Sequence, residues 1–215
     1  MEGISSVKII VADDHPVVRE GLRFFLNNKP GFQVIAEAGD NAEVVKTVSL
    51  YRPDVLILGL LMCGCYSFDL INKLKKQYPK MFVIVYSVFA EECFVYRALQ
   101  AGASGYIDKC IHPRRVIEAI QAVIGGEIWL DMHSAVNDLQ ELKKYMAEMS
   151  GPLTKREIDV IKLVAEGLSN KQIGMSLGIK ERTVKQHLYN LIIKLQAQNR
   201  VHAVMLANRL GILKI

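Results

Sequence analysis

Between residues 8 and 124, short apolar runs alternate with longer amphipathic stretches. The runs predict five strands, at residues 8–12, 33–37, 55–58, 82–86 and 105–107. The stretches between and after them predict helices near residues 17–28, 41–50, 67–77, 91–100 and 113–124. The run at 55–58 is continuously apolar, as expected for a strand covered on both faces. Five βα units in a row predict an α/β fold, a doubly wound, five-stranded parallel sheet with its working site beyond the carboxyl ends of the strands.

The pattern changes after Gly125-Gly126. Residues 131–150 are polar with weak helical spacing, and four helical segments follow from Leu153 onward. Thr154-x-x-Glu157 has the spacing of a capping box, which predicts the start of the first of these helices. We therefore expect an α/β domain over residues 1–130, a partly helical linker over 131–150 and an all-α, four-helix domain over 151–215.

Residues 168–195 predict a short helix, a turn at Gly178 and a longer helix that begins near Glu181. A short helix that braces a second one across a tight turn suits insertion of the second helix into the major groove of DNA. Apolar residues at helical spacing are expected to face the core; they are Val184, Leu188, Leu191, Ile192 and Leu195. Lys185 and Gln186 remain outside, where they can reach base edges. Phosphate contacts are expected from Arg182, Lys194, Ser169, Asn170 and Lys171.

The net charge of +5 is unevenly distributed along the chain. Residues 1–130 hold 14 basic and 14 acidic residues, whereas residues 151–215 hold 11 basic and four acidic ones, a net charge of +7. A neutral larger part joined to a short basic part is typical of a DNA-binding protein with a separate control module. A helical bundle with a solvated basic face is the alternative.

Composition restricts the class of protein. Hydrophobic residues make up 51% and charged residues 23% of the chain, which is typical of a globular protein. No apolar run is long enough for a membrane span, and no secretory signal is visible at the N-terminus. Four cysteines without such a signal indicate a reducing compartment rather than a disulfide framework. We expect a cytoplasmic protein that does not contact a membrane.

Three motifs in residues 151–213 resemble the LuxR-type helix-turn-helix. They are Leu-Thr-x-Arg-Glu at 153–157, Ala-Glu-Gly-Leu-Ser-Asn-Lys-Gln-Ile at 165–173 and Glu-Arg-Thr-Val-Lys-Gln-His at 181–187. The resemblance implies that Lys185, Gln186 and Tyr189 contact bases, and it places Thr183 among the DNA-binding residues. It also implies a homodimer on double-stranded DNA, with the last helix, around residues 201–210, as the dimer surface. Gln196-Ala197 departs from the family's glycine or asparagine followed by valine, and only a local effect is expected.

The N-terminal part resembles the receiver domain of NarL/FixJ-class response regulators, which is flavodoxin-like. Asp13 and Asp14 match the acidic pair that holds a divalent cation in that family. Ser87 matches its switch hydroxyl, and Tyr106 and Lys109 match its switch aromatic residue and its phosphate-pairing lysine.

The phosphoacceptor aspartate of that family is missing. The strand at 55–58 runs into Gly59, where the family has the aspartate that forms an acyl phosphate. Cys63 and Tyr66-Ser67 also depart from the usual loop, so the resemblance implies natural loss of phosphotransfer. Asp54 and Asp69 are not substitutes, because neither is expected at the carboxyl end of the strand.

Loss of this carboxylate also weakens the cation site, because Mg²⁺ requires several well-placed oxygen ligands. Lys109 is then expected to pair directly with Asp13 or Asp14; a solvated loop lysine is the alternative. We expect no metal, no cofactor and no catalytic residues, and hence no enzyme.

The four cysteines, Cys63, Cys65, Cys93 and Cys110, are expected at one end of the sheet, around the vacated site. Small buried or half-buried thiols are the favoured interpretation, and a redox or metal sensor is the alternative. His15 is expected to belong to the start of a helix rather than to a ligand set, and Met62 is expected in the core.

These observations together predict a sequence-specific DNA-binding transcription regulator, an atypical response regulator that acts without aspartyl phosphorylation, as a dimer. One alternative keeps the DNA-binding domain and makes the receiver a sensor of redox state or of a small ligand through a cysteine-lined pocket. Another makes the receiver a protein-interaction module whose fourth helix docks a second regulator.

Overall fold

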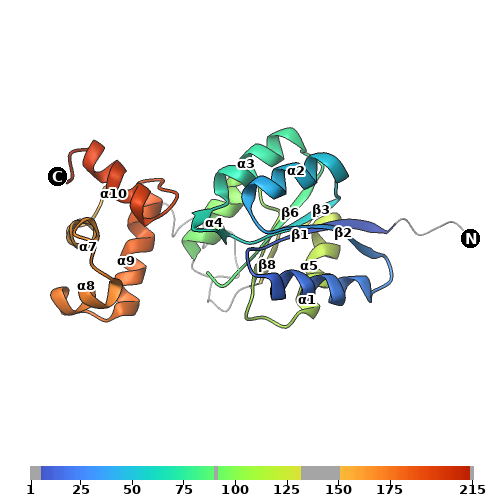
Figure 1. Cartoon of the computed structure of the whole chain (residues 1–215), viewed down its shortest axis with the longest axis horizontal. Coiled ribbons are helices and arrows are strands. Elements are labelled where there is room, and N and C mark those ends of the chain that lie inside the picture. The colour runs from blue at the N-terminus through green and yellow to red at the C-terminus, as the bar shows by residue number, and fades with distance from the viewer. Residues whose placement is uncertain (1–5, 90–91, 132–150, 214–215) are drawn as a thin grey trace, which may run out of the picture. The chain divides into compact units, whose positions relative to one another are not determined.

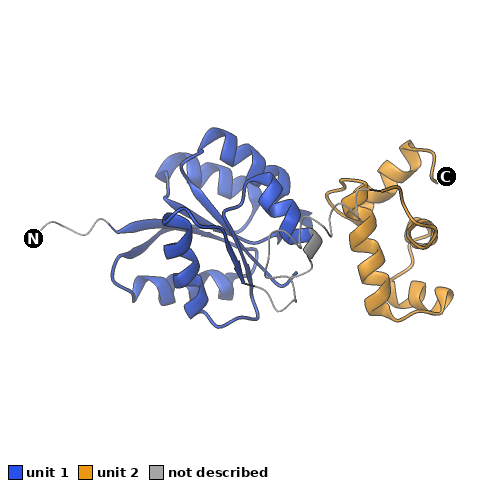
Figure 2. Cartoon of the chain, turned by 180° about the vertical axis from the view of Figure 1, so that it is seen from behind, with its two compact units in different colours: residues 1–139 blue, residues 140–215 orange. Residues whose placement is uncertain are grey.

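The computed structural model describes residues 6–89, 92–131 and 151–213, which form two compact units. Unit 1 covers residues 1–139 and unit 2 covers residues 140–215 (Figure 2). The division falls within the expected linker, and the helical character expected at 132–150 lies outside the described residues. Asp131, expected to open the linker, instead ends a strand.

Unit 1 is built on a parallel sheet with strand order β2-β1-β3-β6-β7-β8 (Figure 1). Its strands are β1 (Val7–Ala12), β2 (Phe32–Ala38), β3 (Val55–Leu58), β6 (Phe82–Ser87), β7 (Gly105–Asp108) and β8 (Trp129–Asp131). The predicted doubly wound α/β class and its five strands are confirmed, but the sheet has a sixth strand. β8 was missed because its three residues are all half-buried and give no run of apolar positions.

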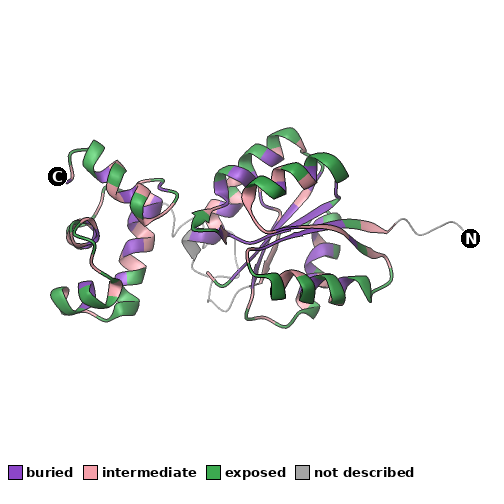
Figure 3. Ribbon diagram, in the orientation of Figure 1, coloured by how far each residue is buried: buried purple, intermediate pink, exposed green. Residues whose placement is uncertain are grey.

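Helices cover both faces of this sheet (Figure 1). α1 (Pro16–Asn27) and α5 (Arg114–Ile124) lie on one face. α2 (Asn41–Tyr51), α3 (Phe68–Gln77) and α4 (Glu92–Ala101) lie on the other. All four residues of β3 are buried, as the continuous apolar run predicts, and Figure 3 shows buried positions along the central strands. Fully burying one such aliphatic side chain stabilises the fold by roughly 1.5–3 kcal/mol.

A small hairpin follows β3, where the sequence predicted only a loop. It pairs β4 (Leu61–Met62) with β5 (Cys65–Tyr66) in antiparallel register. Its two turn residues, Cys63 and Gly64, have φ angles of 49° and 80°. Positive φ at both positions is what a tight two-residue hairpin requires. Met62 is 1% exposed, as expected of a core residue.

Unit 2 contains the four predicted helices: α7 (Lys155–Ala165), α8 (Asn170–Leu177), α9 (Glu181–Lys194) and α10 (Arg200–Arg209). The capping box expected at the start of α7 is present, because Thr154 Oγ1 accepts from Glu157 N while Glu157 Oε2 accepts from Thr154 N. Gly178 ends α8 with a φ of 65°, the left-handed conformation that glycine tolerates. Within the described ranges, no helix has the length and apolar character needed to cross a membrane.

Candidate functional site

The carboxyl ends of β1 and β3 meet at the centre of the sheet, where the strand order reverses. Gly59 N donates to Ala12 O at 2.8 Å, so the glycine lies directly beside the acidic pair Asp13 and Asp14. The structure therefore brings together the residues predicted for the receiver pocket, with no carboxylate on the strand β3.

Asp13 is already bound within this pocket. Lys109 Nζ lies 2.5 Å from Asp13 Oδ2, and the two side chains are only 16% and 3% exposed. The direct ion pair expected from the sequence is thus confirmed for Asp13. The other carboxylate oxygen, Oδ1, accepts from His15 N at 3.0 Å.

The space in front of Gly59 is filled by this same carboxylate. A Cβ atom built on Gly59 would lie 2.9 Å from Asp13 Oδ2, closer than real Cβ contacts. A side chain at position 59 would therefore displace Asp13 from its present position beside Lys109.

Asp14 and His15 complete the acidic end of the pocket. Asp14 Oδ2 accepts from Cys63 N at 3.1 Å, and Asp14 Oδ1 lies 2.8 Å from His15 Nδ1. One ligand atom from each of Asp13, Asp14 and His15 lies within 4.8 Å of the others. A receiver fold implies a bound Mg²⁺ ion, but these residues do not fit one. Asp13 Oδ2 is paired with the Lys109 ammonium, and Gly59 supplies no third carboxylate. His15 is the N-cap residue of α1, as predicted.

The two predicted switch residues are held by one segment after β6. Ser87 Oγ accepts from Phe89 N at 3.1 Å, and the hydroxyl of the fully buried Tyr106 donates to Phe89 O. Beside them, burial raises the pKa of Tyr86, and the charges of Asp13 and Asp108 raise it further.

A cavity of about 310 Å³ opens beside this pocket. It is lined by Asp14, His15, Val18, Leu60, Leu61, Ser87, Val88, Phe89 and Lys109. None of these residues is a cysteine, so this cavity is not the cysteine-lined pocket of the alternative interpretation.

The cysteines that the structure describes are exposed rather than buried. Cys63 and Cys65 lie in the β4–β5 hairpin, and Cys110 lies in the loop after β7. The expectation of buried or half-buried thiols is therefore wrong for these three, because the hairpin turn and the loop project them into solvent. A hydrogen bond from the Cys110 thiol to Asp108, together with the aspartate charge, raises the pKa of that thiol. The side chain of Cys93 lies outside the described residues.

In unit 2, α9 presents the polar residues predicted to read bases. Its buried face consists of Val184, Leu188, Leu191, Ile192 and Ile193. Lys185 is exposed, with Nζ 3.6 Å from Glu181 Oε1, and Gln186 Nε2 donates to Asn190 Oδ1 at 3.1 Å. Arg182 and Thr183 are exposed, and Gln186 and Tyr189 are half-buried.

Lys194 is not part of that surface. Its Nζ lies 2.9 Å from Glu157 Oε2, and the two side chains are 7% and 3% exposed. The prediction that Lys194 faces outward and contacts phosphate is wrong, because α7 packs against the end of α9 and supplies a buried carboxylate there. The capping-box signal located Glu157 but gave no indication of this long-range partner.

The predicted phosphate-binding residues lie at the start of α8. Ser169 caps this helix by accepting from Gln172 N, Asn170 is half-buried and Lys171 is exposed. Lys180, which the sequence reasoning did not single out, is an exposed cation at the N-cap of α9. Helix N-termini offer free backbone N–H groups, which favour anions.

The departure at Gln196-Ala197 has a local explanation. Gln196 has a φ of 53°, a left-handed conformation in which glycine or asparagine is less strained. Ala197 is fully buried. In α10, Val201 and Met205 are 66% and 59% exposed, one helical turn apart, on the helix predicted to be the dimer surface.

Comparisons with known proteins agree with this architecture. Residues 9–121 match the response regulator receiver domain, and residues 151–207 match the bacterial regulatory proteins of the luxR family. The nitrate/nitrite response regulator protein NarP of Escherichia coli (strain K12) is 37% identical over 203 residues, which cover 93% of each chain. The uncharacterized transcriptional regulatory protein YxjL of Bacillus subtilis (strain 168) is 32% identical over 213 residues, 97% of this chain and 98% of its own.

Solved structures are also similar. The crystal structure of the response regulator ChrA, from a heme-sensing two-component system, matches with a TM-score of 0.50 at 30% identity and covers 97% of this chain and all of its own. RcsB from Salmonella enterica serovar Typhimurium, bound to a promoter, matches with a TM-score of 0.60 over 95% of this chain and 99% of its own, and at 22% identity it supports the fold alone. The chain belongs to the NarL/LuxR family of response regulators, DNA-binding transcription regulators, not enzymes, that join a receiver to a LuxR-type helix-turn-helix domain.

Proposed function

We propose that this response regulator acts without aspartyl phosphorylation and binds its DNA site as an unphosphorylated homodimer. The observation that carries the proposal is the glycine at the carboxyl end of β3, beside an Asp13 carboxylate that is bound to Lys109. Glycine has no carboxylate to form an acyl phosphate, and the lysine that would pair with the phosphate already has an anionic partner.

Other aspartates do not replace the missing one. Asp54 precedes β3, and its Oδ2 accepts from Lys8 N at 2.8 Å, so it lies at the opposite edge of the sheet. Asp69 is in the first turn of α3. Neither follows the end of a central strand as Gly59 does.

Incubation of the full-length chain with acetyl phosphate and Mg²⁺ tests this part of the proposal. The intact mass should remain unchanged, because position 59 carries no carboxylate. Gly59→Asp is the informative comparison, since it restores a carboxylate and displaces Asp13 from Lys109. A stoichiometric gain of one phosphate on an aspartate of the unmodified chain would contradict the proposal.

We further propose that α9 reads the major groove. Lys185 and Gln186 lie near the start of this helix, on the face left free by Val184, Leu188 and Leu191. Lysine can donate to guanine O6 or N7, and glutamine can pair with adenine N6 and N7. Arg182, Thr183 and Tyr189 flank them, while Ser169, Asn170 and Lys171 at the start of α8 are assigned to phosphates.

Two lysine substitutions separate base reading from phosphate contact. Lys185→Ala should weaken binding to the true site by about 1–3 kcal/mol and flatten the preference at one base position. Lys171→Ala should weaken binding to all sequences alike and reduce the salt slope by about one unit. Binding-site selection followed by salt titration measures both effects. Full sequence preference in Lys185→Ala, with loss of preference in Lys171→Ala, would contradict the groove assignment.

Dimerisation is proposed through α10. RcsB has been solved as two dimers bound to two parallel DNAs. In the present chain the exposed Val201 and Met205 form an apolar stripe on α10. Such a stripe loses contact with water when a second copy covers it, which supports a dimer on a two-fold symmetric site.

A further inference from the structure

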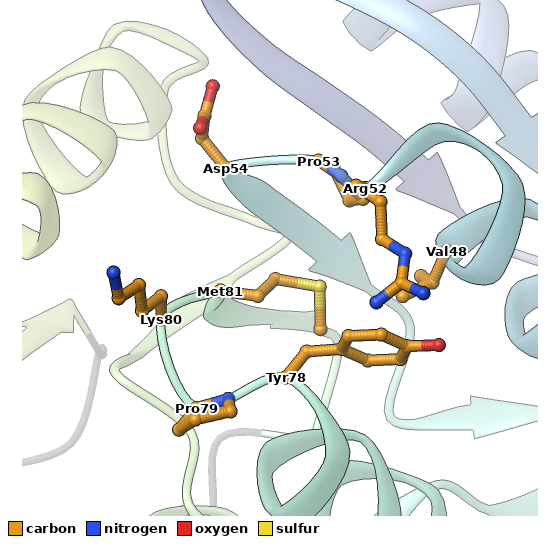
Figure 4. A pocket seen from close by; sticks show the side chains of 8 residues that line it. All are labelled: Val48, Arg52, Pro53, Asp54, Tyr78, Pro79, Lys80 and Met81. Carbon is orange, nitrogen blue, oxygen red and sulfur yellow. The ribbon is translucent and has the colours of Figure 1, made fainter.

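Unit 1 has a second cavity that the function proposed above does not use. Residues 52–54 lead into β3 and residues 78–81 lead into β6, and between these segments lies a cavity of about 380 Å³ (Figure 4). Gly59 follows the carboxyl end of β3, so this cavity lies at the opposite, amino edge of the sheet. Its volume falls in the range of roughly 300–1,000 Å³ that is typical of small-molecule sites.

The floor of the cavity is apolar. Its accessible apolar surface comes from the half-buried Tyr78 and the exposed Pro79, above the buried side chains of Val48, Pro53 and Met81. Figure 4 shows the Met81 side chain extending towards the ring of Tyr78. Such a floor favours the hydrocarbon part of a ligand over a fully hydrated ion.

Both walls of the cavity are held in place. On one side, Lys75 Nζ donates to Pro79 O at 2.9 Å and to Met81 O at 2.7 Å. On the other side, Arg52 Nε donates to Ser49 O at 3.1 Å. Because hydrogen bonds within the protein already fix these walls, the lining residues lose little conformational entropy when a ligand binds.

Arg52 has an unusual backbone for its residue type. It ends α2 with a φ of 47° and a ψ of 64°, a left-handed conformation that usually selects glycine. Its guanidinium carbon lies 4.5 Å from the centre of the Tyr78 ring, within the range of a cation–π contact. A strained residue that presents a positioned functional group to a cavity indicates a functional site.

The cations around this cavity are left unpaired by their neighbours. Within residues 6–89, 92–131 and 151–213, the terminal nitrogens of Arg52 and the ammonium of Lys80 have no hydrogen-bond or ion-pair partner. Asp54 is the acidic residue in the lining, and its Oδ2 accepts from Lys8 N. Figure 4 shows the Asp54 carboxylate turned away from Tyr78 and Met81. It also shows the Lys80 ammonium turned away from them, so Arg52 is the cation beside Tyr78.

We propose that this cavity binds a small aromatic carboxylate, with the carboxylate on Arg52 and the ring against Tyr78 and Pro79. The planar guanidinium suits a carboxylate because its N–H groups match the two oxygens. The apolar floor distinguishes this ligand from an inorganic anion, which would leave the floor uncovered.

Titration of the ¹⁵N-labelled full-length chain with phenylacetate tests the proposal, with phenylacetamide and inorganic phosphate as matched probes. Saturable amide shifts should centre on residues 48–54 and 78–81. Phenylacetate should bind about tenfold more tightly than neutral phenylacetamide, since one charge-assisted hydrogen bond is worth about that factor. Inorganic phosphate should not saturate the same amides.

Two variants assign the interaction. Arg52→Asn removes the guanidinium but keeps a residue that tolerates the left-handed backbone, and it should weaken phenylacetate binding about tenfold. Lys46→Ala removes the same charge from an exposed position of α2 outside the cavity and should bind as the unmodified chain does. Thermal unfolding of both variants checks that unit 1 remains folded.

Several outcomes would overturn the proposal. They are shifts centred elsewhere in the chain, equal affinity for phenylacetate and phenylacetamide, saturation by inorganic phosphate at the same amides, or unchanged affinity in a folded Arg52→Asn variant. An equal loss in Lys46→Ala would also overturn it, because the attraction would then be general and not local.

Discussion

Both units pair a lysine with a carboxylate that is almost completely buried. In unit 1, Lys109 Nζ lies 2.5 Å from Asp13 Oδ2, and in unit 2, Lys194 Nζ lies 2.9 Å from Glu157 Oε2. Asp13 and Glu157 are each 3% exposed, whereas the lysines differ, at 16% for Lys109 and 7% for Lys194. Both are lysine–carboxylate ion pairs, but their structural surroundings differ.

The unit 1 pair joins residues that follow two strands, at the pocket where a receiver carries its chemistry. The unit 2 pair joins α7 to the end of α9 in the interior of a helical domain. In the first case, the family resemblance assigns Asp13 to a cation and Lys109 to a phosphate, but the two residues pair with each other. In the second, a lysine that was predicted to contact phosphate instead pairs with a buried carboxylate at the end of the proposed recognition helix. Burial and partner therefore decide the role of a charged residue more than its type does.

Breaking the unit 2 pair should have the largest effect. Lys194→Ala leaves the Glu157 carboxylate buried without an opposite charge, since the Thr154 N–H that remains is neutral. This loss should cost unit 2 about 3–5 kcal/mol of unfolding free energy. Urea unfolding of the full-length chain measures this by circular dichroism. The single tryptophan, Trp129, lies in β8 and reports on unit 1 by its fluorescence, which should be unchanged.

Two control variants sharpen this test. Lys185→Ala removes an exposed lysine from the same helix and should change stability by no more than about 0.5 kcal/mol. The double variant Glu157→Leu, Lys194→Met removes both charges and should be less destabilised than Lys194→Ala alone. A Lys194→Ala variant as stable as Lys185→Ala would show that this pair is not structural.

The unit 1 pair should be less sensitive. Lys109→Ala is expected to cost about 1–3 kcal/mol, because Lys109 is more exposed than Lys194 and water can reach Asp13 once the lysine side chain is removed. The Trp129 fluorescence transition in urea measures this loss. A cost equal to that of Lys194→Ala would erase the difference between the two pairs.

Helical glycines provide a second comparison between the units. A Cβ on Gly174, in α8, would lie 2.8 Å from the backbone oxygen of Ile179, whereas a Cβ on Gly21, in α1, would meet nothing within 4 Å. Gly174→Ala should therefore destabilise unit 2 by about 1–3 kcal/mol through overpacking. Gly21→Ala should stabilise unit 1 by about 0.5–1 kcal/mol. The same two urea transitions measure both, and destabilisation by Gly21→Ala would contradict the open space at that position.

The smallest expected effect concerns Cys110, an exposed residue in the loop after β7. Asp108 raises the pKa of its thiol, so less thiolate is present at neutral pH. Asp108→Asn should therefore speed alkylation of Cys110 by iodoacetamide near pH 7, and the two rates should converge as the pH rises above the raised pKa. Peptide mass spectrometry measures the rates. Equal rates at neutral pH would show that Asp108 does not control this thiol.

Local patterns in the sequence were sufficient for most of the fold. The apolar runs predicted β1, β3 and β6 to within one residue, and Thr154-x-x-Glu157 predicted the first helix of unit 2. Both succeed because strand period and helix capping depend on residues that are near neighbours in the chain. The absence of a carboxylate at position 59 is equally a sequence fact, since glycine has none wherever its backbone is placed.

Tertiary structure decided what the sequence left open or got wrong. Asp13 and Lys109 are 96 residues apart, and no local pattern could choose between this pair and a solvated lysine. Lys194 is polar and helical, which predicted an outward position, yet the packing of α7 gives it a buried partner 37 residues away. The cavity beside Arg52 likewise forms only where the segments before β3 and β6 meet. The charge of a segment and the spacing of its apolar residues are properties of that segment alone. The burial of its side chains and their ion-pair partners depend on which distant segments the fold packs against it.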